Sequence, residues 1–200
     1  SKDSLCEAVA PHADARVFSA LVQDPPRWGD YENSRKVFPA LGEALRRHPD
    51  ALPVVLGNRV MPDYLNDKDF PMSVLLSAGK EMMPRVHDSL ASTNWIERRN
   101  AARVCGAMGD QDSIPALRQA LQKEESWPQE HMVRALGALH ATEALPDVIA
   151  GYWRFREISD GRLEEWMLPQ AVIVSQTPIP RRRLAGRRTE EDSRVMSAYY

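Results

Sequence analysis

The chain has 200 residues, of which 43% are hydrophobic and 27% are charged. This composition indicates one globular domain or two small ones and excludes a disordered or fibrous chain. The formal charge of −2 counts against a general nucleic-acid binder, because affinity for the phosphate backbone requires a net basic surface.

Two helices are expected upstream of the main sequence pattern. Residues 12–22 are amphipathic with a helical period, and Asp24, Pro25 and Pro26 end that segment. Residues 33–47 predict a second helix, with Pro39 near its start. No apolar run approaches the roughly 18 residues that span a bilayer. No signal peptide is evident either, so we expect a soluble protein, with a cytoplasmic location favoured over a periplasmic or secreted one.

A period of 31 residues organises the middle of the chain. It is marked by Pro53, Pro84, Pro115 and Pro146. Each proline follows an apolar residue, precedes an aliphatic residue by two positions, and comes three positions after an acid. The acids are Asp50, Glu81, Asp112 and Glu143. Proline is tolerated in the first turn of a helix, where its missing N–H has no intrahelical partner. Each motif therefore predicts the start of a short helix, with the acid at or near the N-cap.

A partner helix is predicted before each of the last two motifs. Asn94 and Glu97 have the spacing of a capping box, and Ser126 and Gln129 repeat it. The sequences of the two predicted helices align without gaps, and Gly106 of one corresponds to Gly137 of the other. We expect these glycines to let neighbouring helices approach closely.

Residues 100–117, NAARVCGAMGDQDSIPAL, resemble the short HEAT-like repeat first noted in phycobilin lyases. The likeness is strong over residues 95–150, fair over 64–91 and weak over 35–60. Cys105 replaces the usual leucine, and His140 and Ala141 stand where the family shows Gly-Asp. The last change leaves the turn of the fourth unit uncertain. The resemblance implies stacked helix pairs that share one elongated core.

The predicted fold is all-α, a right-handed α-solenoid of four to five HEAT-like helix pairs with capping segments at both ends. The repeat domain is expected over residues 1–176, with repeats near 33–60, 64–91, 95–124 and 126–153 and an irregular cap at 154–176. Residues 177–200 form an arginine-rich tail with six arginines against three acids. Its candidate contacts are Arg181, Arg182, Arg183, Arg187 and Arg188. The tail either binds an anion or acidic partner or folds back onto the acidic body, and we favour the second interpretation.

Catalytic signals are weak. The five histidines, His12, His48, His87, His131 and His140, show no metal-ligand spacing, and no phosphate loop or nucleophile elbow is present. We therefore predict no catalytic residue, no metal and no cofactor. Cys105 lies in the apolar row of its repeat and is expected to be an inert filler. Two reduced thiols are the favoured state of Cys6 and Cys105, although a disulfide between them stays open.

The function that we predict is a non-catalytic scaffold or adaptor that holds another protein. An assembly factor or a toxin-neutralising immunity protein of a GC-rich bacterium would fit, and the oligomeric state stays open. In a solenoid of helix pairs the second helices line the concave face. The candidate contacts on that face are Arg85, Asp88, Arg118, Gln119, Gln122, Asp147 and Arg154. Trp127 and Trp153 are further candidates, since each is expected at a helix end, where an aromatic side chain can be exposed, although the core is the favoured place for each tryptophan. An enzyme or enzyme subunit of the HEAT-like lyase type is the alternative that the resemblance implies, and nucleic-acid binding through the tail is a further alternative.

Overall fold

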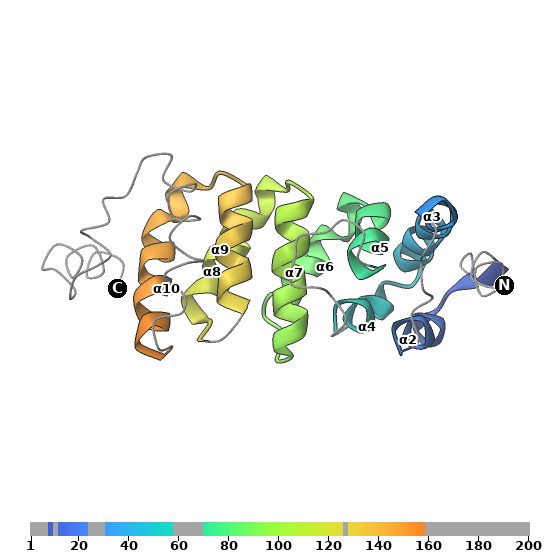
Figure 1. Cartoon of the computed structure of the whole chain (residues 1–200), viewed down its shortest axis with the longest axis horizontal. Coiled ribbons are helices and arrows are strands. Elements are labelled where there is room, and N and C mark those ends of the chain that lie inside the picture. The colour runs from blue at the N-terminus through green and yellow to red at the C-terminus, as the bar shows by residue number, and fades with distance from the viewer. Residues whose placement is uncertain (1–7, 10–11, 24–30, 58–69, 126–127, 159–200) are drawn as a thin grey trace, which may run out of the picture.

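The computed structural model describes residues 8–9, 12–23, 31–57, 70–125 and 128–158. Within these ranges the backbone forms helices and the short turns between them, with no strand, which confirms the all-α prediction. The helices follow one another along the long axis of the molecule, with α2 and α10 at opposite ends (Figure 1). This is the architecture of a solenoid, in which each unit packs mainly on its neighbours.

Four helix pairs form the body of the described chain. The first helices of the pairs are α3 (Tyr31–Arg47), α5 (Phe70–Ala78), α7 (Trp95–Ala107) and α9 (Pro128–Ala138). The second helices are α4 (Leu52–Leu56), α6 (Met83–Ser89), α8 (Ile114–Lys123) and α10 (Leu145–Ile158). Helix α2 (Ala15–Gln23) packs on α4 at the amino-terminal end. The predicted helices at 12–22 and 33–47 are thus confirmed to within a few residues.

The 31-residue period is confirmed by the setting of the four prolines. Each proline is the second residue of a second helix, and each of these helices follows a short 3-10 turn. The 3-10 turns are Pro49–Ala51, Lys80–Met82, Gln111–Ser113 and Thr142–Ala144. The aliphatic residue two positions after each proline is 0% exposed. The motif therefore fixes both the start of a helix and the side chain that this helix places in the core.

Two local predictions are wrong. The acids of the motif lie near the N-caps as predicted, but the capping role expected of them is absent: they lie within the 3-10 turns, are exposed, and make no capping bond to α4, α6 or α8. The 3-10 turn continues into the helix, so its own backbone hydrogen bonds replace a side-chain cap. Pro39 lies in the middle of α3 and not near its start, because that helix begins at Tyr31.

The predicted cap of α7 is confirmed. The Asn94 side chain accepts a hydrogen bond from the backbone N–H of Ile96 at 3.0 Å, and its amide nitrogen donates to Glu97 at 3.2 Å. The equivalent prediction for α9 stays a prediction, and Gln129, its described member, is fully buried near the start of that helix. Ser126 lies outside the described residues.

Close helix crossings hold the first helices together. A Cβ atom on Gly106 of α7 would lie 3.0 Å from Ala135 Cα of α9, which confirms the predicted close approach at Gly106. A Cβ on Gly42 of α3 would lie 2.6 Å from the Ala78 backbone nitrogen at the end of α5. Helix α7 also contacts α4, where the buried Asn100 amide donates to the Leu56 carbonyl oxygen at 2.6 Å.

The turn of the fourth unit keeps the family's shape without its glycine. His140 has a φ of 52°, in the left-handed region, at the position that Gly109 occupies one repeat earlier with a φ of 59°. The N–H groups of His140 and Ala141 bond the carbonyl oxygens of Gly137 and Leu136, which forms a Schellman motif at the end of α9. Ala141 and Leu136 are both buried, as the apolar contact of this motif requires. The turn therefore keeps its geometry at the cost of backbone strain.

Candidate binding groove

The second helices α8 and α10 are joined by a polar clasp. The Arg118 Nε donates to Asp147 Oδ2 at 2.5 Å, and the Gln122 amide donates to Asp147 Oδ1 at 2.7 Å. Arg154 reaches back and donates to the carbonyl oxygens of Leu121, at 2.7 Å, and Gln122. Asp147 is only 4% exposed, so these charge-assisted bonds compensate the burial of its carboxylate. We call Arg118, Gln122, Asp147 and Arg154 the α8–α10 clasp.

The preceding pair of second helices, α6 and α8, lacks such a clasp. Because the two junctions are related by 31 residues, each clasp residue has an equivalent in this pair. These equivalents are His87, Ala91, Ala116 and Lys123. Two of the four are alanines, and the position of the Asp147 carboxylate is taken by the Ala116 methyl group. No hydrogen bond or ion pair joins α6 to α8 in the described chain, and few of their residues touch.

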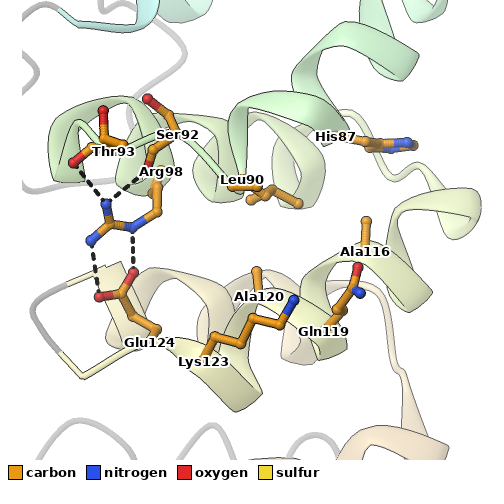
Figure 2. A pocket seen from close by; sticks show the side chains of 11 residues that line it. His87, Leu90, Ser92, Thr93, Arg98, Ala116, Gln119, Ala120, Lys123 and Glu124 are labelled. Carbon is orange, nitrogen blue, oxygen red and sulfur yellow. Dashed lines mark hydrogen bonds and ion pairs between the residues drawn. The ribbon is translucent and has the colours of Figure 1, made fainter.

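A groove of about 430 Å³ opens between α6 and α8 as a result. Figure 2 shows it from close by, with the side chains of Leu90, Ala116 and Ala120 at its centre. Lys123 and Gln119 lie on the side of α8 that faces it. The complete lining is His87, Leu90, Ala91, Ser92, Thr93, Arg98, Ala116, Gln119, Ala120, Lys123 and Glu124. The groove thus has an apolar centre and hydrogen-bonding groups around it.

Arg98 forms one end of the groove. Its guanidinium donates to both oxygens of Glu124, at 2.6 and 3.1 Å, and to the carbonyl oxygens of Ser92 and Thr93 (Figure 2). Glu124 is buried, and the pair ties the start of α7 to the end of α8. This end of the groove is therefore rigid and electrically neutral.

His87 forms the other end, in contact with a serine and an aspartate. Its Nε2 lies 2.8 Å from Ser113 Oγ and 3.2 Å from Asp110 Oδ2, while the Ser113 hydroxyl donates to the same carboxylate. A catalytic relay requires the acid and the serine on different nitrogens of the imidazole ring. Here both contact Nε2, and Ser113 is fully buried. The cluster therefore holds α6 against the turn before α8 and has no geometry for nucleophilic catalysis.

The structure places the predicted contact residues in different settings. Gln119 lines the groove, while Arg85 and Asp88 are exposed on α6. Arg118, Gln122, Asp147 and Arg154 meet one another in the α8–α10 clasp, so they already have partners within the chain. The candidate contact Trp153 is 8% exposed and lies in the core, because α10 continues to Ile158 and Trp153 is not at its end. Trp127 and the five tail arginines lie outside the described residues.

Most of the groove residues were not predicted from the sequence. Lys123, Ala116 and Ala120 are ordinary helix residues by type, and His87 was given no role. The 31-residue period nevertheless contains a signal for the groove. When each clasp residue is aligned with the residue 31 positions earlier, the polar Gln122 and Asp147 correspond to Ala91 and Ala116. Trp95 was also missed: it is 41% exposed on the first turn of α7, with the Arg99 guanidinium 5.6 Å from its ring centre.

Two buried residues with strongly shifted pKa values, Cys105 and His131, lie outside the lining of the groove. Burial raises the pKa of the Cys105 thiol to about 11, which fits the inert filler that its place in the repeat predicted. Burial lowers the pKa of His131 to about 3, helped by the positive charges of Arg103, Arg134 and Arg99. In the described ranges, no three His, Cys, Asp or Glu side chains converge as a metal site would require.

Residues 83–154 match the family model of HEAT repeats, which covers α6 to most of α10 and therefore includes the groove. This part of the chain is therefore similar to HEAT repeats in sequence. HEAT repeats generally form non-catalytic scaffolds for protein–protein interaction. No curated protein and no solved structure gives a significant match to the chain. None of the helices in the described ranges is long and apolar enough to cross a membrane.

Proposed function

We propose that the protein is a non-catalytic scaffold that holds a segment of another protein in the groove between α6 and α8. The observation that supports it most is the missing clasp. Two helices that are joined by charged side chains in the next repeat are left apart here, within the stretch that matches HEAT repeats. A groove of about 430 Å³ accommodates a few side chains of an extended segment.

The chemistry of the groove suits binding better than catalysis. Its centre is made of apolar side chains, and its carboxylate, Glu124, is fully used by Arg98. An adaptor, an assembly factor and an immunity protein all need such a surface, and the proposal does not choose between them.

Filling the groove tests this proposal. Ala120→Trp places an indole over the centre of the groove, and Ala107→Trp places one at the exposed end of α7 as a matched control. Both variants and the unchanged chain are used as bait in an extract of the native host, after circular dichroism has shown equal helicity. We expect Ala120→Trp to lose a partner that Ala107→Trp retains. Equal recovery of every partner by both variants would contradict the proposal.

A further inference from the structure

We propose that the groove binds an acidic segment of its partner, with one carboxylate seated over Ala116. This inference rests on the proposed function and adds the chemistry of the ligand. In the α8–α10 clasp the equivalent place is filled by the Asp147 carboxylate, which accepts bonds from α8. Between α6 and α8 this carboxylate is absent from the chain, since Ala116 stands at its position. An incoming Asp or Glu side chain supplies the missing group.

The donors that would meet this carboxylate are on the wall of the groove. Lys123 is exposed and makes no ion pair in the described chain, and the Gln119 amide makes no hydrogen bond there. Lys123 stands at the position from which Arg154 closes the clasp one repeat later. A positive charge therefore remains at the edge of the groove although the clasp itself is absent.

The charge balance of the lining points to the same class of ligand. The positive charge of Arg98 is neutralised by Glu124, and His87 Nε2 is already bonded to Asp110 and Ser113. Lys123 then leaves a net charge of one positive unit around an apolar centre. The preferred segment accordingly carries an acid next to an apolar residue, which would contact Leu90 and Ala120.

Selection from a library of random dodecapeptides tests both the groove and its preference, and it does not require the natural partner. The baits are the full chain, Ala120→Trp to fill the groove, and Lys123→Glu to reverse its charge. Ala116→Asp supplies the carboxylate from within, and Ala116→Asn is its uncharged match in size. The thermal unfolding of each variant is measured first. Lys123 is exposed, so its reversal is expected to leave the fold intact even if a substitution at Ala116 does not.

We expect peptides selected by the full chain to be rich in Asp and Glu beside an apolar residue. Their affinity should fall by about tenfold or more with Lys123→Glu and with Ala116→Asp, and it should fall less with Ala116→Asn, which fills the same space without adding a negative charge. Peptides that bind the full chain but not Ala120→Trp, and that are not enriched in Asp or Glu, would overturn the inference and leave the proposed function standing. Peptides that bind Ala120→Trp as well as the full chain, or a selection that enriches none, would overturn both.

Discussion

Asp147 of α10 accepts a hydrogen bond from Arg118 of α8 at 2.5 Å, whereas the equivalent residues one repeat earlier, Ala116 and His87, make no such contact. The same backbone motif therefore produces a closed junction at one place and an open one at another. What distinguishes the two is a small number of side chains on the facing surfaces of the second helices. The site proposed above is the open junction.

Removing the charge at the centre of the clasp is expected to destabilise the carboxy-terminal end of the solenoid. Asp147→Asn loses the charge-assisted bond to Arg118, and we expect a loss of about 1–3 kcal/mol in the free energy of unfolding. Urea unfolding followed by circular dichroism measures it. Asp112→Asn, at an exposed acid in a 3-10 turn, serves as the control and should change stability by less than about 0.5 kcal/mol. An equal change in the free energy of unfolding for the two variants would contradict a stabilising role of the clasp.

The left-handed turn at the end of α9 predicts a pair of opposite effects. His140→Gly removes the strain of a side chain at a φ of 52°, so we expect a gain of about 0.5–1 kcal/mol in stability. Gly109→Ala introduces the same strain where no atom lies within 4 Å of the new Cβ, so we expect a loss of about 1 kcal/mol. Differential scanning calorimetry of both variants checks the prediction. A lower melting temperature for His140→Gly would contradict it.

The buried His131 predicts that stability falls on acidification. Its pKa in the folded protein, about 3, lies below the ordinary value of 6.5, so the unfolded chain binds the extra proton first. Stability from this residue is fully present above pH 6.5 and is lost progressively as the pH falls toward 3. Linkage gives a loss of about 2 kcal/mol at pH 5. Urea unfolding at pH 8 and pH 5 should show this difference in the unchanged chain and in His12→Gln, but not in His131→Gln. A difference that persists in His131→Gln would assign the effect to other groups.

The thiol of Cys105 is expected to be inert in the folded protein. It is fully buried, and burial raises its pKa to about 11, so little thiolate forms at neutral pH. In the Cys6→Ser variant, where Cys105 is the remaining cysteine, we expect a disulfide reagent to react only after denaturant is added. Spectrophotometric titration with Ellman's reagent measures this. Rapid reaction of the native variant would place Cys105 at the surface.

Much of the fold was predictable because its determinants are local and repeated. A proline in the first turn, an apolar residue directly before it, an aliphatic residue two positions after it and a fixed spacing are visible in the sequence, and they specify the four second helices. The Asn94 cap and the close crossing at Gly106 follow from the same local rules. Asp50 and Glu81 lie one position before the N-caps and do not cap their helices, because sequence spacing does not distinguish an N-cap from a residue in a preceding 3-10 turn.

The groove was not predictable from residue types alone. Arg118, Asp147 and Arg154 have the character of free polar side chains on a binding face, but each finds a partner across a helix junction. That pairing depends on the relative placement of two helices, which no single helix reveals. Conversely, Ala116 and Lys123 line the groove because the polar side chains that would close this junction are absent. Such a site becomes visible when the repeats are compared position by position in three dimensions.

Hydrogen–deuterium exchange on the full chain, alone and saturated with a selected acidic peptide, tests the central claim most directly. We expect slower exchange over residues 87–93 and 116–124, which flank the groove, and unchanged exchange in α3 and α5. The same experiment with Ala120→Trp should show no protection at any position. Protection confined to residues 177–200, or to the surface of α7 around Trp95, would contradict the assignment of the groove as the binding site.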